Sequence, residues 1–206
     1  MKIRLMAACL LAALLLGSCR GGEKAEQDSG NEVWEKLSPE ELDFNPFRTI
    51  GKDWMALAVG KDESMNSMTI SWGGAGVLWN KPVFTVYVSS DRYSKRLMDD
   101  NAYFTVMAFP HERRYKDALL YIGSKSKRDE PDKTADAGFT VEYTELGNPL
   151  FMEAALAFEC RIIYREEFKM ELLPSDVRRM YEDTGLHTMY VGEIVNVYGK
   201  RPAAEQ

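Results

Sequence analysis

The segments Asn-Ser-Met-Thr-Ile-Ser-Trp (66–72) and Lys-Pro-Val-Phe-Thr-Val-Tyr-Val-Ser-Ser-Asp-Arg-Tyr-Ser (81–94) determine how the rest of the chain is interpreted. In the first segment apolar and hydroxyl-bearing residues alternate, which is the period-two pattern of a strand with two different faces. The second segment has the β-branched and aromatic residues of a buried strand over about 83–88, followed by a polar stretch that begins at Ser89. The sequence therefore predicts two strands, the second of which runs into a turn.

The polar stretch leads into a predicted helix that has Ser94 as its N-cap. Residues 95–100 are good helix formers, with Leu97 and Met98 on one side. The free N–H groups at a helix start, two hydroxyls and the forked guanidinium of Arg92 together favour an anion, most naturally a phosphate. The alternative is that these residues only form a turn and a cap.

The N-terminus has the features of an export signal. Basic residues precede an unbroken apolar run over residues 5–16, which is too short to span a bilayer but long enough for a signal-peptide core. The run ends in Leu16-Gly17-Ser18-Cys19, which resembles the bacterial lipobox, in which the cysteine is lipidated. We therefore predict a signal peptide over residues 1–18, lipidation of Cys19 and a membrane-anchored lipoprotein on the periplasmic or outer-membrane side. An ordinary secretory signal is the alternative, and it also implies export.

The remainder divides into a tether and one domain. Residues 19–31 have no large apolar side chain that could anchor them, so we predict a flexible tether. Residues 32–202 have the length of a single domain, and 45% hydrophobic residues in the chain are enough for a substantial core.

Charge and cysteine content exclude several classes of function. The chain has 26 basic and 32 acidic residues, a net charge of −6, and loss of the two basic residues of the leader leaves 24 against 32, or −8. Nucleic acid is therefore not a predicted partner.

Only Cys160 lies in the predicted domain, which excludes an intradomain disulfide and a thiolate metal cluster. We predict that Cys160 packs as a small hydrophobe, and we predict no metal site.

The other predicted elements favour a mainly β (α+β) fold, a β-barrel with a few peripheral helices, because strands are many and no βαβ alternation is present. Strands are predicted over about 54–59, 102–109, 139–145, 154–170 (bent or bulged midway) and 188–198. Helices are predicted over 112–122 and 175–183, the latter capped by Ser175, and a short one is capped by Ser38 and stopped at Asn45-Pro46.

Gly73-Gly74-Ala75-Gly76 does not form a dinucleotide-binding loop. The fingerprint needs a third glycine where Trp79 stands, and no helix is predicted after it. We predict a compact crossover whose glycines let another backbone or a flat ring approach closely.

Several segments together resemble the flavin reductase and flavoredoxin family. They are 66–72, Lys-Pro-Val (81–83), Ser-Ser-Asp-Arg-Tyr-Ser (89–94), Tyr-Ile-Gly-Ser-Lys-Ser (121–126), Asp-Lys (132–133) and Gly-Leu-His-Thr-Met-Tyr-Val-Gly-Glu-Ile (185–194). The resemblance implies a split β-barrel that binds FMN, and commonly a homodimer with the flavin near the subunit interface.

The resemblance also implies which residues bind the cofactor. The isoalloxazine ring would be bordered by Asn66, Ser67, Met68, Thr69, Ser71 and Trp72; the phosphate end would be held by Ser89, Ser90, Arg92, Tyr93 and Ser94, with Ser126 and Lys133 closing over it and His187 approaching from the last strand. The chain departs from the family at Lys127, where glycine is usual, and at Glu130-Pro131, which adds a residue before Asp132.

We therefore expect an FMN-dependent, flavin reductase-like electron-transfer protein, with no acid, base or nucleophile identified. Two alternatives are a flavin-binding lipoprotein without turnover and a related barrel that binds another planar cofactor such as haem. Export would separate the protein from the cytoplasmic nicotinamide pool, so we expect a membrane-bound or protein electron donor.

Overall fold

The computed structural model describes residues 32–202. The predicted signal peptide, Cys19 and the predicted tether lie outside the described residues. No helix between residues 32 and 202 is long and apolar enough to cross a membrane.

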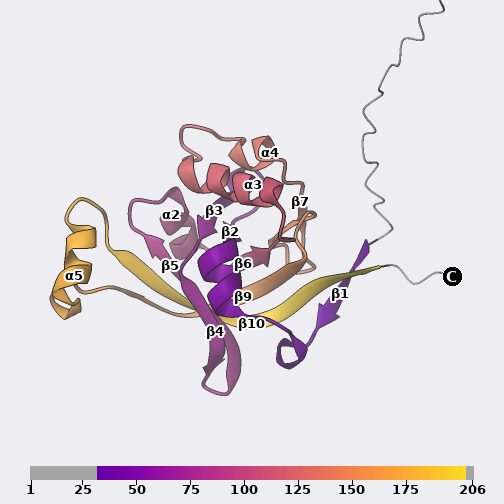
Figure 1. Cartoon of the computed structure of the whole chain (residues 1–206), viewed down its shortest axis with the longest axis horizontal. Coiled ribbons are helices and arrows are strands. Elements are labelled where there is room, and N and C mark those ends of the chain that lie inside the picture. Colours follow the sequence, from indigo (N-terminus) through magenta and orange to yellow (C-terminus); the bar gives the residue numbers. More distant parts are fainter. Residues whose placement is uncertain (1–31, 203–206) are drawn as a thin grey trace, which may run out of the picture. The chain divides into compact units, whose positions relative to one another are not determined.

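Eight strands form one sheet in the order β3-β2-β6-β9-β10-β5-β4, with β1 added alongside β10 (Figure 1). They are β1 (Glu32–Leu37), β2 (Met55–Val59), β3 (Asn66–Ile70), β4 (Gly73–Leu78), β5 (Lys81–Ser89), β6 (Tyr103–Ala108), β9 (Leu156–Glu167) and β10 (His187–Pro202). A separate hairpin joins β7 (Val141–Tyr143) to β8 (Pro149–Phe151). Every pairing is antiparallel, so the prediction of a mainly β fold is confirmed.

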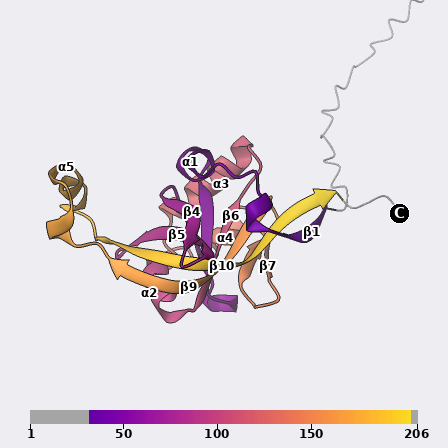
Figure 2. The same ribbon diagram turned by 90° about the horizontal axis from the view of Figure 1, so that it is seen from below.

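The helices are short and lie at the periphery of the sheet. They are α1 (Pro46–Arg48), α2 (Tyr93–Asp100), α3 (Arg113–Ser124), α4 (Lys133–Asp136) and α5 (Ser175–Arg178), together with the single turns η1 (Pro39–Glu41), η2 (Thr49–Asp53), η3 (Asp62–Ser64), η4 (Met170–Leu172) and η5 (Arg179–Tyr181). Figures 1 and 2 show α5 beyond the ends of β9 and β10, away from the other helices.

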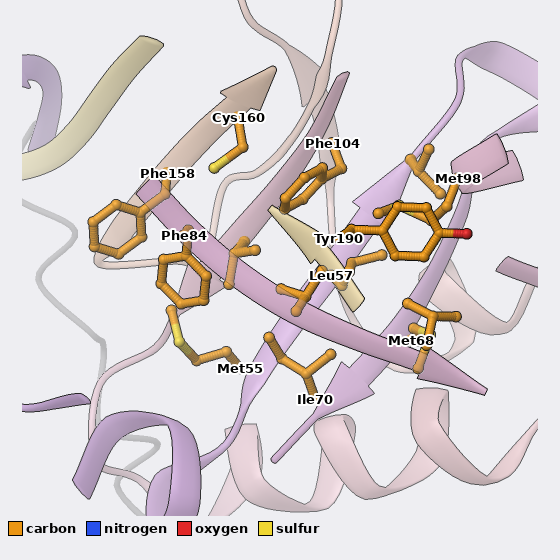
Figure 3. Packing of buried hydrophobic residues seen from close by; sticks show 14 of the residues in the cluster. Met55, Leu57, Met68, Ile70, Phe84, Met98, Phe104, Phe158, Cys160 and Tyr190 are labelled. Atoms are coloured by element: carbon orange, nitrogen blue, oxygen red, sulfur yellow. The ribbon is translucent and has the colours of Figure 1, made fainter. Parts of the chain in front are cut away.

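Strand β2 is buried on both faces and so belongs to two cores. Met55 and Leu57 point into the larger core with Phe84, Phe104 and other side chains, as Figure 3 shows. Ala56 and Ala58 point the other way, because successive side chains of a strand alternate, and they pack in the second core with Leu119 and Ile122 of α3. These small alanines let α3 lie close to the sheet.

Cys160 lies in the larger core and is completely buried. Burial raises the pKa of its thiol well above the usual range, and the neighbouring Glu159 adds to this. The prediction that Cys160 packs as a small hydrophobe is confirmed.

Two predicted serine caps are wrong. Helix α2 starts at Tyr93 with Arg92 in the cap position, and Ser94 lies inside the first turn, where its Oγ accepts a hydrogen bond from Asn66 Nδ2 at 2.7 Å. Ser175 is the first residue of α5, and Pro174 holds the cap position. The third, Ser38, is the N-cap of η1, followed by Pro39 as predicted, but its side chain makes no capping bond to the backbone.

Asn45-Pro46 starts a helix rather than ending one. Asn45 Oδ1 accepts a hydrogen bond from the backbone N–H of Arg48 at 3.2 Å, and Pro46 occupies the first helical position of α1. Proline is well tolerated there, since its missing N–H has no partner in a first turn.

Residues 73–76 form a strand rather than a crossover. Strand β4 pairs with β5 in a hairpin whose two-residue turn is Trp79-Asn80, with φ of 52° and 57°. Two positive φ values are typical of a type I′ turn. The expected close approach does occur at Gly73, where an added Cβ would lie 2.7 Å from the carbonyl oxygen of Thr85.

The bend predicted in the long strand 154–170 is confirmed. The register between β9 and β10 shifts between Val191 and Gly192 and again between Ile194 and Asn196. The strands predicted over 54–59 and 66–72 are present as β2 and β3, and they pair with each other in antiparallel fashion. Strands β1 and β8 and helix α4 were not anticipated, and the strand predicted over 139–145 is limited to β7.

Candidate functional site

The end of β3, the end of β5 and the start of β10 surround a cavity of about 270 Å³. Its lining residues are Met68, Thr69, Ile70, Ser71, Trp72, Tyr87, Ser89, Arg92 and His187. They come together because β10 pairs with β5 so that His187 stands opposite Ser89. Three segments that are far apart in the sequence therefore meet at one place.

A second cavity of about 320 Å³ adjoins the first and extends under α3. It is lined by Trp54, Thr69, Ser71, Arg92, Leu119, Leu120, Gly123 and Ser124. Because Thr69, Ser71 and Arg92 line both cavities, we treat the two as one continuous groove.

The sequence did not single out Trp54, Tyr87 or the α3 residues as part of a site. Leu119 has the helical spacing of an ordinary core residue, and Tyr87 lies in an ordinary strand pattern. Trp54 was predicted only as the first residue of the strand over 54–59, which is not specific to a site.

A third cavity of about 390 Å³ lies outside α2, and we call it the outer cavity. It is lined by Ser90, Asp91, Arg92, Tyr93, Lys95, Arg96, Asp99, Asp100 and Arg128. Arg92 thus belongs to the groove and to the outer cavity at once. Its Nη1 donates to the carbonyl oxygen of Gly123 at 2.8 Å. A guanidinium has five N–H donors, so this bond leaves others for an anion.

The turn from Ser89 to Arg92 is bonded to the segment that precedes β10. The backbone N–H of Ser90 donates to Leu186 O at 2.9 Å, and Ser89 Oγ donates to Gly185 O at 3.1 Å. In return Gly185 N–H donates to Asp91 Oδ2 at 2.6 Å. The two segments therefore hold each other in place beside the groove.

His187 packs between two aromatic rings. Its ring centroid lies 5.1 Å from that of Trp72 and 5.6 Å from that of Tyr181. Burial lowers the pKa of His187, the cationic Arg92 lowers it further, and Asp91 acts in the opposite direction. The imidazole is therefore neutral at pH 7. Its Nδ1 is buried and has no hydrogen-bond partner among the described residues.

Trp72 is 45% exposed, so this tryptophan belongs to the surface of the groove and not to the core. The strand pattern placed Trp72 on the same face as Met68 and Ile70, but β3 ends at Ile70. The alternation consequently does not continue to residue 72.

Three predicted cofactor-binding residues are buried behind the groove instead of lining it. Asn66 and Ser94 bond to each other, and Ser67 Oγ lies 2.8 Å from Thr134 Oγ1. These bonds join β3 to α2 and to α4. These hydrogen bonds hold β3, which carries residues of the groove, against α2 and α4.

Ser126 lies in the loop after α3 and Lys133 is the first residue of α4, and neither lines the groove. Lys133 is buried, and its Nζ donates to Ile122 O at 3.0 Å and to Lys125 O at 2.8 Å, at the C-terminal end of α3. Burial, Arg92 and Lys127 lower its pKa to about 8. Ser126 Oγ accepts a hydrogen bond from Arg128 N–H at 3.2 Å.

The two departures from the family pattern have partners in this loop. Lys127 Nζ donates to Met65 O at 2.6 Å, which ties the loop to the residue before β3. Glu130 accepts hydrogen bonds from Lys125 Nζ at 2.5 Å and from Tyr121 OH at 2.8 Å. A hydrogen-bonded loop therefore stands where the family usually has a glycine turn.

The groove fits a planar polar ring with an anionic tail. Trp54 and Trp72 supply flat apolar surface, and Thr69 and Ser71 supply hydroxyls. His187 supplies a buried nitrogen that has no hydrogen-bond partner within residues 32–202. Arg92 stands where the groove meets the outer cavity, which carries both cations and carboxylates. Pockets that combine apolar walls with a few converging polar groups are typical of cofactor sites.

Solved structures with the same fold are flavin proteins. Flavoredoxin from Methanosarcina acetivorans is 25% identical with a TM-score of 0.56, over 71% of this chain and 68% of that one. The FMN-binding domain of a flavin reductases-like enzyme from Shewanella baltica is 13% identical with a TM-score of 0.57, over 82% and 78%. An NADH:FAD oxidoreductase from Streptomyces globisporus, in complex with NAD and FAD fragments, is 21% identical with a TM-score of 0.54, over 74% and 77%.

Comparison with curated protein sequences gives no match. The family model described as "Flavin reductase like domain" matches residues 50–206. The fold is accordingly the split barrel of these proteins, as the sequence resemblance implied. Since the matched region covers well over half of the sequence, the chain belongs to the flavin reductase like domain family.

Proposed function

We propose that this protein binds FMN in the groove and transfers electrons through it as a flavin reductase-like oxidoreductase. The observation that carries the proposal is the meeting of Thr69, Ser71, Trp72 and His187 around one cavity with Arg92 at its end. The bound flavin would supply the redox chemistry, and the protein would orient the ring and set its potential by hydrogen bonds and charge.

In this proposal Arg92 and Ser90 bind the phosphate and the end of β3 borders the ring. A neutral His187 adds no charge beside Arg92, so the guanidinium remains the fixed cation of the groove. The buried residues Asn66, Ser67, Ser94 and Lys133 act indirectly, by holding β3, α2 and α3 in position.

FMN is proposed rather than FAD because of the charges in the outer cavity. The outer cavity is lined by four cations, Arg92, Lys95, Arg96 and Arg128, and by three carboxylates, Asp91, Asp99 and Asp100. This leaves one positive charge in excess (4 minus 3), which favours one phosphate over two. Purified protein should be yellow, and chromatography of the flavin released on denaturation should identify FMN. FAD as the released flavin would overturn this choice, and a colourless protein that takes up no flavin would overturn the function.

We further propose, from Leu16-Gly17-Ser18-Cys19, that the protein is exported and lipid-anchored, and that its electron donor is membrane-bound or a protein. A homodimer is proposed from the family resemblance, with light scattering as its test. Anaerobic stopped-flow mixing of the FMN-loaded protein with NADH and NADPH tests the donor. Slow or absent bleaching of the flavin is expected, whereas bleaching within seconds at physiological nucleotide levels would show that a free nicotinamide nucleotide is the donor.

A further inference from the structure

Trp54 has an unfavourable backbone conformation for a large side chain. It joins η2 to β2 with φ of 68° and ψ of 161°, a region that residues other than glycine rarely occupy. Such a conformation costs on the order of 1–3 kcal/mol and persists only when neighbouring contacts hold it. Contacts with neighbouring residues must therefore stabilise this conformation of Trp54.

Lys116 of α3 supplies those contacts. Its Nζ lies 3.2 Å from the centroid of the Trp54 ring, which places the ammonium on the face of the indole. The same Nζ donates hydrogen bonds to the carbonyl oxygens of Lys52 and Asp53, the two residues that directly precede Trp54. Burial lowers the pKa of Lys116, and the nearby Asp53 partly opposes this. One ammonium thus holds both the side chain of Trp54 and the backbone leading to it.

Trp54 stands between the groove and another cavity. This fourth cavity, also of about 320 Å³, is lined by Lys116 of α3 and by His111, which precedes α3, and we call it the rear cavity. Trp54 and Leu119 line both the rear cavity and the groove, so they form the wall that the two share. The position of the indole consequently sets the width of the groove beside Thr69 and Ser71.

We propose that Lys116 is a positioning residue for the groove: it holds Trp54 in the conformation in which the indole forms the wall against which the ring of the cofactor packs. The proposal rests on the proposed flavin site, and it adds two residues that neither the sequence nor the family resemblance assigned to that site. A cation on an aromatic face and two charge-assisted hydrogen bonds are strong enough to offset the unfavourable backbone conformation.

The first test observes the contact in the wild-type chain without flavin. The face of an indole ring shifts the NMR resonances of protons above it upfield. The ε-methylene protons of Lys116 should therefore resonate upfield of those of every other lysine between residues 32 and 202. The shift should disappear in Trp54→Leu. Lys116 resonances at ordinary lysine positions in the wild type would overturn the contact.

The second test uses riboflavin, which has the ring but no phosphate. Lys116→Met should weaken riboflavin and FMN equally, by about tenfold, which corresponds to about 1.4 kcal/mol. Lys116→Arg should restore most of the affinity, because a guanidinium also stacks on an indole and donates hydrogen bonds. Arg113→Met is the matched control: it removes a cation from the same helix, where Arg113 pairs only loosely with Asp117 at 3.6 Å, and should leave both affinities unchanged.

The outcomes separate this inference from the proposed function. Wild-type affinity in Lys116→Met, or an equal loss in Arg113→Met, would overturn the role of Lys116 while leaving flavin binding established. If the wild-type chain binds no flavin at all, both the proposed function and the role of Trp54 beside the flavin ring are wrong. The NMR test still decides whether Lys116 holds Trp54. A thermal midpoint for each variant excludes unfolding as the cause of lost binding.

Discussion

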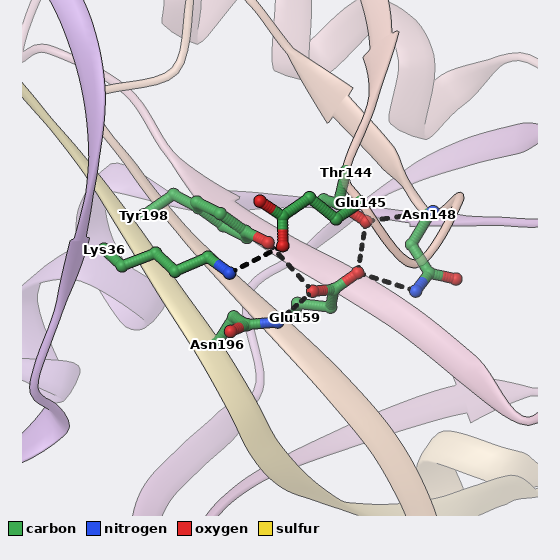
Figure 4. A network of polar contacts seen from close by, with 7 residues as sticks. All are labelled: Lys36, Thr144, Glu145, Asn148, Glu159, Asn196 and Tyr198. Atoms are coloured by element: carbon green, nitrogen blue, oxygen red, sulfur yellow. Dashed lines mark hydrogen bonds and ion pairs between the residues drawn. The ribbon is translucent and has the colours of Figure 1, made fainter.

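Glu159 is a fully buried carboxylate that accepts hydrogen bonds from side chains in two separate parts of the chain. Asn148 Nδ2 and Asn196 Nδ2 donate to it at 2.7 and 2.6 Å, Tyr198 OH donates at 3.1 Å, and Thr144 Oγ1 also donates (Figure 4). Burial and the carboxylate raise the pKa of Tyr198, so its hydroxyl remains a donor. One side chain thus joins the β7–β8 hairpin to β9 and β10.

Replacing Glu159 by alanine should destabilise the domain strongly. The change leaves buried donors without an acceptor, at about 1–3 kcal/mol for each that water cannot reach, and we expect a total loss of about 3–5 kcal/mol. Urea unfolding measures it. Glu145→Ala is the control, since the Glu145 side chain is 79% exposed, and it should change stability by less than about 1 kcal/mol. Similar losses in the two variants would contradict the role given to Glu159.

His187 should make stability depend on pH in a defined direction. Its pKa is lowered in the folded state, so the unfolded chain takes up the proton first as the pH falls. The stability contributed by the neutral imidazole is therefore complete above the unfolded pKa of about 6.5 and is lost as the pH falls through the folded pKa. The free energy of unfolding should fall less steeply below about pH 6.5 in His187→Gln than in the wild type. Parallel pH profiles for the two proteins would show that His187 is not desolvated.

At the scale of elements, the groove depends on how closely α3 lies on β3. A Cβ added to Gly123 would lie 2.9 Å from Thr69 Cβ, and Thr69 lines both parts of the groove. Thr69 Oγ1 also donates to Leu119 O, so side chain and helix are directly bonded. Any outward shift of α3 would therefore move a wall of the groove.

Gly123→Ala should destabilise the domain by about 1–3 kcal/mol, although alanine favours a helix over glycine by about 1 kcal/mol. The matched control is Gly51→Ala in η2, because an added Cβ there meets nothing within 4 Å. Guanidinium unfolding of both variants, with riboflavin titration of each folded protein, measures the effect. A stabilised Gly123→Ala variant would mean that α3 is free to move away from β3.

The order and type of most elements could be predicted from the sequence, whereas several boundaries could not. Alternation of apolar and hydroxyl-bearing residues identified β3, and helical spacing identified α3, because both patterns are local in the sequence. The β4–β5 hairpin was missed because Trp79-Asn80 lacks the glycine that usually marks a type I′ turn. Ser94 was misassigned as a cap because its real partner, Asn66, lies far away in sequence and only the fold brings it near.

The same distinction between local sequence patterns and contacts over long sequence distances explains which residues of the site could be predicted. The turn after β5 carries hydroxyls and a cation in one short segment, so Arg92 could be identified as a candidate from the residues themselves. Thr69, Ser71 and His187 were identified only through the family resemblance. Trp54 enters the groove through packing against α3, and no local pattern reports that contact.

For the whole molecule, anchoring is a separate prediction from flavin binding. The sequence predicts a flexible tether of about twelve residues, for which we expect an r.m.s. length of roughly 20 Å, so that the domain would remain close to the membrane. Cys19→Ala should leave the precursor unprocessed or release the protein from the membrane fraction. Fractionation with immunoblotting measures this, and wild-type precursor found intact in the cytoplasm would contradict both the anchor and the proposed donor.

The proposed FMN site is tested most directly by titrating the flavin-free chain with FMN and with riboflavin. If Arg92 binds the phosphate, FMN should bind at least about tenfold more tightly than riboflavin, and Arg92→Gln should weaken FMN by about 1.5–3 kcal/mol, or ten- to a hundredfold, with riboflavin little changed. Arg96→Gln removes a neighbouring cation of the outer cavity and should have a much smaller effect, because its side chain is 67% exposed. Equal affinities for FMN and riboflavin in the wild-type chain would contradict the account.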